Sequence, residues 1–342
     1  MIRFQADTES SLPIYKQLIR QVTMAVKSRK LLPGEHLPSM NELSAELGIS
    51  KETVKKAYGI LCKNGILIPR QGKGFYVAGE DGGKLSILVL FDKLSIYKQI
   101  LFNSFVEELG DRAEITILTH NQDLDLFTYY LDNALDHYDY YVVTPHFPLD
   151  DESQALARRQ IRRIPNRKLI ITDYRIKSDD GGHFGAVYQD FENDVYDGLM
   201  QGLDRLKDCP MLSVIILERS LYGSLIRRGI ERFSRDMSVP VRFLKETPEE
   251  MFPGETYLIV NSQLDWGLAR LAEKISENHL TVGKDVFIIS YNESGLDSLI
   301  LGGLTTMSTD FRQMGREAAR MISSKETGSV HCNFTLTRRS TF

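Results

Sequence analysis

Polar side chains follow most of the apolar strands that the sequence predicts between residues 85 and 342. Carboxylates, amides and a histidine stand at these strand ends, with two adjacent arginines and several aromatic residues nearby in the chain. In open parallel sheets, small molecules bind beyond the carboxyl ends of the strands. A sugar needs paired hydrogen-bonding groups and an aromatic ring for its C–H side. The candidate ligand-binding residues are Asp92, Tyr97, His146, Asp173, Tyr174, Asp190, Arg227, Arg228, Asn261, Trp266, Asn292 and Glu293.

Several of these residues also have a purely structural interpretation. Aspartate and asparagine at strand ends commonly cap the following helix, and Asp190 and Asn261 could serve only as caps. His146 could be a solvated loop residue, and Trp266 could belong to the apolar core. Arg227 and Arg228 could face either the cleft or the solvent. The sequence leaves these alternatives open.

Apolar strands and amphipathic helices alternate in the part of the chain that would position these residues. Strands are predicted at 85–91, 114–118, 139–144, 168–173, 185–189, 211–217, 240–245, 256–260 and 286–290, and helices at 97–109, 123–136, 150–163, 192–207, 222–236, 264–277 and 310–323. Such alternation is typical of parallel sheets covered by helices on both faces. About 258 residues are generous for one sheet, so we predict an α/β fold with two similar lobes and a ligand cleft between them.

Catalytic and metal-binding motifs are not found in the sequence. It contains no nucleophile elbow, HExxH, P-loop or dinucleotide fingerprint. The three cysteines, Cys62, Cys209 and Cys332, lie far apart, which argues against a disulfide framework or a zinc site. We therefore expect a protein that is not an enzyme and that uses no cofactor and no metal.

The first 78 residues show the pattern of a winged helix-turn-helix. A helix begins after Pro13 and ends before the 32–34 turn, and a capping box, S-x-x-E from Ser39, opens a second helix. A turn at 48–50 leads to a third helix whose apolar stripe excludes Lys51 and Lys55. Two short strands then flank a glycine turn, which favours a wing over a nucleotide loop because no helix follows. The two lysines share an exposed face and could reach a DNA groove or its phosphates.

Charge divides unevenly along the 342 residues. Residues 1–78 hold 12 Lys and Arg against 6 Asp and Glu, whereas residues 79–342 hold 30 against 40. A basic segment on an acidic body suits contact with a polyanion, although a basic face can also be merely solvated. We predict a DNA-binding domain at 1–78, a glycine-rich linker at 79–84 and an effector-binding domain at 85–342. No signal peptide or membrane helix is predicted, so a cytoplasmic location without membrane contact is expected.

The whole first domain resembles the winged helix-turn-helix of GntR-type bacterial regulators. The resemblance rests on G-E-H-L-P-S at 34–39, E-L at 42–43, L-G-I-S at 47–50, T-V-x-x-A-Y at 53–58 and G-I-L at 65–67. It implies DNA contacts from the start of the second helix, the start of the third helix and the wing. Those positions are Asn41, Lys51, Thr53, Lys55, Gln71, Gly72 and Lys73. The family usually has arginine at the first position and often in the third helix, so the bases that are read stay open.

The second domain resembles LacI/GalR-type regulators, which share the fold of periplasmic sugar-binding proteins. The resemblance is firm at F-I-I-S-Y-N-E over 287–293 and at G-L-T-T-M over 303–307, followed by D-F-R-x-M-G-R-E-A-A over 310–319. Three positions of that family differ here, one of them an aspartate that corresponds to Ser262 or Gln263. Asn292 replaces an aspartate, and Ile226 stands at the arginine position, beside Arg227 and Arg228.

A GntR-like head on a LacI-like body is similar to the arabinose-responsive type of regulator. The resemblance implies a homodimeric repressor that binds double-stranded operator DNA and a small sugar such as arabinose, or a deoxy sugar such as fucose. We take release from DNA by the sugar as the working hypothesis. The alternatives are a phosphorylated metabolite as effector, for which the arginines could serve, and a sugar-active enzyme.

Overall fold

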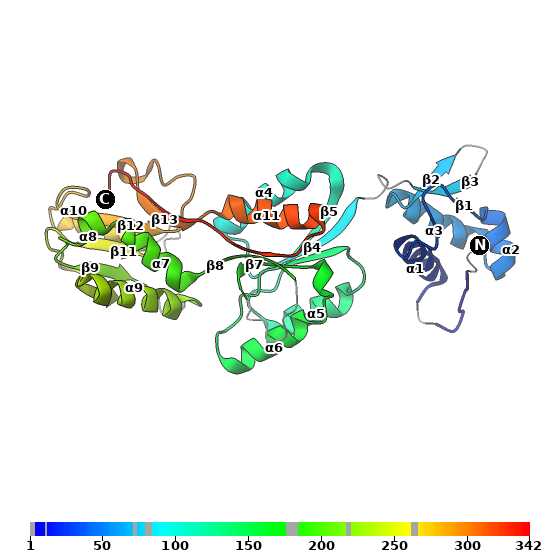
Figure 1. Cartoon of the computed structure of the whole chain (residues 1–342), viewed down its shortest axis with the longest axis horizontal. Helices are drawn as coiled ribbons and strands as arrows, with labels where there is room; N and C mark the ends of the chain where they lie inside the picture. Colours follow the sequence, from blue (N-terminus) through cyan, green and yellow to red (C-terminus); the bar gives the residue numbers. More distant parts are fainter. Residues whose placement is uncertain are drawn as a thin grey trace. The chain divides into compact units, whose positions relative to one another are not determined.

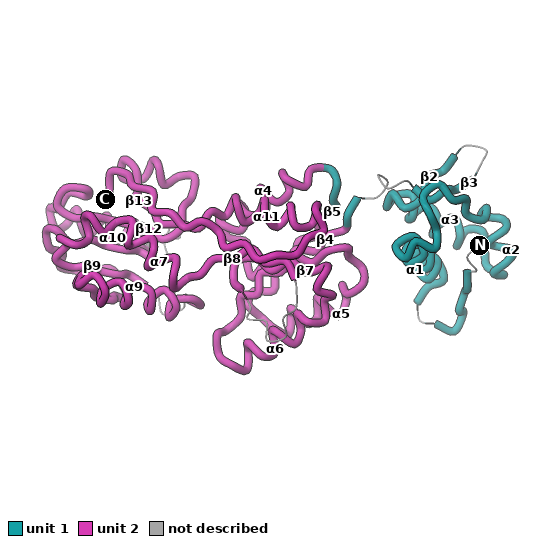
Figure 2. The backbone as a smooth tube through the Cα atoms, in the orientation of Figure 1, with its two compact units in different colours: residues 1–85, 111–114 teal, residues 86–110, 115–342 magenta. Residues whose placement is uncertain are grey.

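The structure is a computed structural model that describes residues 4–10, 12–70, 74–78, 84–175, 184–216, 220–260 and 266–342, and for Trp266 the backbone alone. Two compact units divide the chain, residues 1–85 with 111–114 and residues 86–110 with 115–342 (Figure 2). We call residues 1–84 the head and residues 85–342, which include all strands of the two larger sheets, the body. The predicted linker 79–84 lies outside the described residues except for Lys84.

The head is a helix-turn-helix with a small antiparallel sheet. Its elements are α1 (Ile14–Lys27), β1 (His36–Leu37), α2 (Met40–Leu47), α3 (Lys51–Lys63), β2 (Leu67–Arg70) and β3 (Gly74–Val77), with the strand order β1-β3-β2. The predicted capping box forms, because Ser39 Oγ accepts the Glu42 N–H at 3.2 Å and Glu42 Oε2 accepts the Ser39 N–H at 2.7 Å. The Tyr58 hydroxyl donates to the Pro38 carbonyl at 2.8 Å, which ties α3 to the start of α2. Strand β1 was not predicted, since two residues carry no periodicity.

The first lobe of the body is a six-stranded sheet in the order β14-β8-β7-β6-β4-β5. Its elements are β4 (Leu85–Phe91), α4 (Ile96–Leu109), β5 (Ala113–Thr119), α5 (Leu124–Ala134), β6 (Tyr140–Val143), α6 (Asp151–Ile161), β7 (Leu169–Tyr174), β8 (Gly185–Gln189), α11 (Phe311–Ser324) and β14 (Ser329–His331). Figure 1 shows α4 and α11 on one face of the sheet and α5 and α6 on the other. Helices cover both faces, as the sequence predicts.

The second lobe repeats this plan with the strand order β10-β9-β11-β12-β13-β15. It contains α7 (Phe191–Met200), α8 (Leu203–Leu206), β9 (Leu212–Ile215), α9 (Gly223–Met237), β10 (Val241–Leu244), β11 (Thr256–Ile259), α10 (Trp266–Glu277), β12 (Phe287–Tyr291), β13 (Thr305–Thr309) and β15 (Phe334–Thr337). The single helix predicted at 192–207 was wrong, because the chain breaks at Gln201 and Gly202 into α7 and α8. Strands β13, β14 and β15 were missed, and β15 runs antiparallel to β13.

The chain passes between the two lobes three times within the described residues. The first crossing leads from β8 to α7, the second from β13 to α11, and the third from β14 to β15. The crossings are bonded to one another, since the Asp310 N–H donates to the Asn333 carbonyl and the Cys332 N–H to the Tyr188 carbonyl. Both lobes are therefore held at a shared hinge. In the described part of the chain, every helix is too short or too polar to cross a lipid bilayer.

Candidate functional site

A cavity of about 210 Å³ lies where strand ends of both lobes meet. The first lobe contributes the ends of β4, β7 and β8 with the start of α4, and the second contributes the start of α9 with the end of β12. The lining residues are Asp92, Lys93, Ser95, Tyr97, Lys98, Gln122, His146, Asp173, Gln189, Phe191, Ser220, Leu221, Tyr222, Ile226, Val260, Tyr291, Asn292 and Phe311. Aromatic rings and charged groups thus line one small space, as the strand-end argument predicts.

Four charged or titratable side chains form a buried cluster on the first-lobe side of the cavity. The Lys98 ammonium binds the Asp173 carboxylate and lies 3.7 Å from Asp92 Oδ1. The His146 ring bridges the same two carboxylates, with Nδ1 3.2 Å from Asp92 Oδ2 and Nε2 3.2 Å from Asp173 Oδ2. With both basic groups protonated, the two negative charges are balanced. Buried charges are stable only when they are paired in this way.

The surroundings shift the pKa values of this cluster in opposite directions. Burial by itself would raise the pKa of Asp92 and of Asp173, yet Lys98 and His146 hold both well below their usual range. Burial and Lys98 oppose protonation of His146, but the two carboxylates outweigh them and raise its pKa. Burial lowers the pKa of His120, which lies behind the cavity and bonds the Thr144 carbonyl, to about 4. The carboxylates are therefore ionised and favour a charged His146.

Gln189 connects the charged cluster to the hinge. Its side-chain N–H donates to Asp173 Oδ1, and its Oε1 accepts a hydrogen bond of 2.8 Å from the Thr309 hydroxyl. Gln189 ends β8 at the first crossing, and Thr309 ends β13 at the second. Gln189 therefore joins Asp173 by hydrogen bonds to two of the segments that connect the lobes.

Two strand-end residues face the cavity from opposite lobes in the left-handed conformation. Asp173 has φ of 74° and Asn292 has φ of 70°, a region that Asp and Asn enter more readily than other non-glycine residues but still at a cost. Buried polar atoms at the cavity also lack hydrogen-bond partners among the described residues, namely Asp92 Oδ1, the Tyr222 hydroxyl and Asn292 Oδ1. Unsatisfied polar groups in a cavity are available to a polar ligand.

Five of the residues singled out in the sequence line the cavity. They are Asp92, Tyr97, His146, Asp173 and Asn292. His146 lies in a loop but is buried, so the structure disagrees with the solvated interpretation. The ring of Tyr97 stacks on Phe311 at 5.4 Å. These residues come from three strand ends, one helix and one loop, and the fold brings them together.

The other candidates that the structure describes lie outside the cavity lining. Tyr174 packs behind it on Tyr222, with ring centroids 4.9 Å apart. Asp190 caps α7 by accepting the Asn193 N–H at 3.2 Å, as the alternative interpretation holds. Of the remaining candidates, Arg227 lies over the Phe243 ring, Arg228 pairs with Glu192, and Glu293 pairs with Arg339. Asn261 and the side chain of Trp266 are outside the described residues.

Lys98, Gln189 and Tyr222 line the cavity, and sequence reasoning missed them. Lys98 carried a usable signal: it stands three and seven residues before Leu101 and Phe105, on the buried stripe of α4. A lysine on such a stripe requires a buried partner. Gln189 and Tyr222 carry no comparable signal, since their roles depend on how the two lobes meet.

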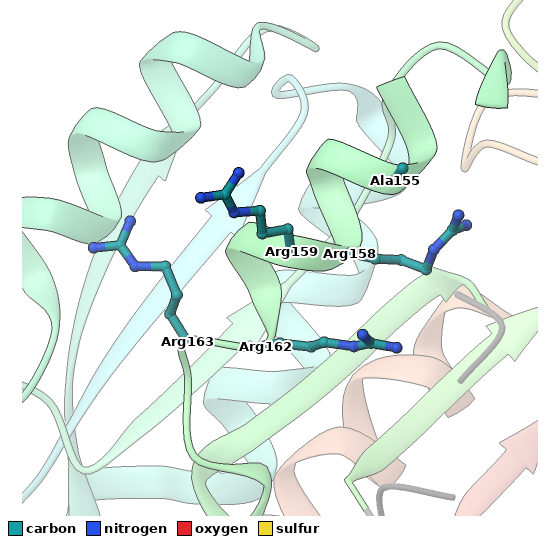
Figure 3. A pocket seen from close by; sticks show the side chains of 5 residues that line it. All are labelled: Ala155, Arg158, Arg159, Arg162 and Arg163. Carbon is teal, nitrogen blue, oxygen red and sulfur yellow. The ribbon is translucent and has the colours of Figure 1, made fainter. Parts of the chain in front are cut away.

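A second hollow of about 500 Å³ is lined by arginines of α6 and the residues after it. They are Arg158, Arg159, Arg162 and Arg163, with Ala155. Figure 3 shows Arg159 and Arg163 pointing to one side of the helix and Arg158 and Arg162 to the other. Because the guanidinium groups diverge, they do not converge on one anion as the cavity residues converge on one point.

The head presents the predicted DNA-contacting residues at two helix starts. Asn41 is exposed in the first turn of α2, and Lys51 and Lys55 are exposed one turn apart on α3. The Thr53 hydroxyl bonds the Ser50 hydroxyl at 2.8 Å within the helix cap. Gln71, Gly72 and Lys73 lie outside the described residues.

Comparison with known proteins identifies the class of the head. Residues 14–77 match the family model "Bacterial regulatory proteins, gntR family". The HTH-type transcriptional repressor YtrA of Bacillus subtilis is 38% identical over 74 residues, which are 22% of this chain and 57% of that one. The arabinose metabolism transcriptional repressor of Geobacillus stearothermophilus is 34% identical over 70 residues, 20% of this chain and 19% of that one. The chain thus spans little more than half of the first relative and a fifth of the other.

The body has the fold of LacI-type regulators. A solved structure of a dimeric Lac repressor with a C-terminal deletion superposes with a TM-score of 0.59 at 18% identity, covering 75% of this chain and 98% of that one. At this identity the likeness concerns the fold. The head therefore matches a family of bacterial regulatory proteins, and the likeness of the body is one of fold. More particularly, the head is a gntR-family winged helix-turn-helix, followed by a LacI-like domain built on the periplasmic-binding-protein plan.

Proposed function

We propose that the protein is a cytoplasmic transcription repressor whose DNA affinity is set by a small neutral sugar bound between the lobes of the body. The cavity with its charge-balanced cluster is the observation that supports this proposal most, because it couples ligand-binding groups to the hinge. The head supplies the exposed lysines for operator DNA. The basic charge of residues 1–78 and the acidic charge of residues 79–342 fit the same assignment of DNA binding to the head and ligand binding to the body.

Size and charge of the cavity support a monosaccharide. Its volume of about 210 Å³ is smaller than drug-sized pockets of roughly 300–1,000 Å³. Two carboxylates accept hydrogen bonds from ligand hydroxyls, Lys98 and His146 donate to ligand oxygens, and the Tyr222 and Phe191 rings offer flat apolar surface. Because the cluster is already balanced, a neutral ligand leaves its charges paired. Arabinose and deoxy sugars such as fucose are the first compounds to test.

The phosphorylated-metabolite alternative receives less support. Arg227 and Arg228 pair with Glu231 and Glu192, and Arg175 packs on the Tyr188 ring, so none of these arginines lines the cavity. A phosphate next to Asp92 and Asp173 would meet like charge in a buried setting. Among the described residues that line the cavity, Lys93 is the basic group outside the charge-balanced cluster, and it is exposed.

We propose that ligand binding acts through the hinge. A sugar that bonds Asp173 competes with its contact to Gln189, and Gln189 is bonded to Thr309 of the second lobe. A ligand shifts an equilibrium only through unequal affinity for its two states. A ligand that contacts both lobes has unequal affinity for the two states, because all of its contacts form together in only one arrangement of the lobes. The working hypothesis remains that the sugar releases the operator.

A homodimer is proposed as the acting form. Leu94, Leu296 and Leu299 are 60%, 55% and 75% exposed on the body. The fold that the body shares with a dimeric Lac repressor supports this assembly, and these side chains are candidates for the contact. Two heads would then read two half-sites of one operator.

The experiment is a thermal-shift panel followed by a gel shift on the full chain. L-arabinose and L-fucose are compared with their phosphorylated forms, and a sugar at 100 times its Kd adds about 2.7 kcal/mol of stability. Asp173→Asn should abolish the shift, whereas Arg228→Ala, outside the cavity, should retain it. Response to phosphorylated sugars alone would contradict the neutral-sugar proposal, and tighter operator binding with sugar would reverse the sign.

A further inference from the structure

The exposed face of α3 carries one acidic side chain among its lysines. Glu52 is the second residue of the helix, and its side chain is 79% exposed. Its carboxylate lies 3.2 Å from the ammonium of Lys55, whose side chain is 64% exposed. Residues three apart on a helix share a face, so Glu52 and Lys55 point outward together.

Neighbouring side chains of the same helix start are engaged elsewhere in the head. The Thr53 hydroxyl belongs to the Ser50 cap, and the Lys56 ammonium lies 4.0 Å from the centre of the Tyr15 ring on α1. Lys51, Glu52 and Lys55 are exposed at this helix start, and so is Lys56 despite its contact with the Tyr15 ring.

A carboxylate on a surface that meets DNA is repelled by the phosphates. A hydrogen bond donated by a base can compensate for that repulsion. In the major groove, the characteristic partner of glutamate is the N4 amino group of cytosine. The Lys55 ammonium at 3.2 Å offsets part of the negative charge as the helix approaches the backbone. We propose that Glu52 selects a cytosine in each operator half-site, with Lys55 holding its carboxylate. This inference rests on the DNA-binding function proposed above.

The test selects binding sites from a randomised duplex library with the full-length wild type and with Glu52→Gln. Wild-type sites should share a cytosine in each half-site. Glutamine pairs with adenine N6 and N7, so the variant should prefer adenine at that position, with a change in relative affinity of roughly five- to 150-fold. The matched control is Glu46→Gln, which removes the same charge from the exposed end of α2 and should keep the wild-type motif.

Each outcome of the selection tests whether Glu52 reads a base. An unchanged motif in Glu52→Gln, at unchanged melting temperature, would overturn the proposal and leave Glu52 as a surface charge of the helix. A motif that changes equally in Glu46→Gln would overturn it too, because the effect would then be general electrostatics. Failure of the wild type to enrich any site would contradict the proposed function instead of the role of Glu52.

Discussion

Lysines serve the head and the body in opposite environments. On α3 of the head, Lys51 and Lys55 are exposed, and the carboxylate beside Lys55 is exposed too. In the body, Lys98 is 4% exposed and lies against Asp92 and Asp173. Exposed pairs contribute little to stability, whereas the members of a buried pair depend on each other. Substitution of a charged residue on the exposed face of α3 should therefore change stability little. Substitution of a charged residue in the buried cluster of the body should lower stability strongly.

The largest expected difference in stability between the head and the body comes from loss of the buried lysine. Lys98→Met keeps most of the aliphatic chain but leaves two buried carboxylates with His146 alone. Breaking a buried pair costs about 3–5 kcal/mol, and the unfolding free energy of the body should fall by that amount. Urea unfolding followed by the fluorescence of Trp266, the single tryptophan of the chain, measures it.

Lys93→Met is the control for this experiment. Lys93 also lines the cavity but is exposed, and surface substitutions usually change stability by less than about 0.5 kcal/mol. Equal effects of the two substitutions would mean that the Lys98 cluster does not differ in kind from a surface lysine.

A smaller effect is expected from the charge on His146. Its pKa is raised in the folded protein because Asp173 and Asp92 outweigh burial and Lys98. A raised histidine pKa gives stability that is complete below the unfolded value of about 6.5 and is lost as pH rises through the folded value. The wild type should therefore lose unfolding free energy above pH 6.5 more steeply than His146→Gln, by up to about 1.4 kcal/mol per pH unit. Parallel pH profiles of the two proteins would show that His146 is neutral in the cluster.

Periodicity along the chain was enough to predict most of the fold. Long strands such as β4 and helices such as α9 were placed within a residue or two, because burial on one face or both leaves a regular apolar pattern. Strands β14 and β15 were missed, since three or four residues at a sheet edge leave no such pattern. Their places depend on the hinge, where the chain returns to both sheets late in the sequence.

Prediction of the site was likewise limited to what a local pattern in the sequence shows. Asp92 and Asp173 were found because parallel strands bring their ends to one edge of a sheet. Arg227 and Arg228 were chosen from their place beside a glycine, but α9 turns both outward to Glu231 and Glu192. Lys98 was overlooked because lysine is ordinarily a surface residue. What the sequence lacks is the pairing between distant segments of the first lobe that makes a buried charge stable.

The smallest expected change in stability belongs to the head, where Lys55→Ala tests the other side of the comparison. An exposed lysine that meets a phosphate adds about 0.9 to the slope of log affinity against log salt concentration, so the variant should lose about that much of the slope at nearly unchanged melting temperature. Titrations of one operator duplex between 50 and 200 mM salt, roughly the range over which such contacts matter, measure the slope. Lys63→Ala, at the far end of α3 and also exposed, should keep the wild-type slope. If both variants lost it equally, the effect would come from the net charge of the head, and a flat response of Lys55→Ala would remove that lysine from the phosphate contacts.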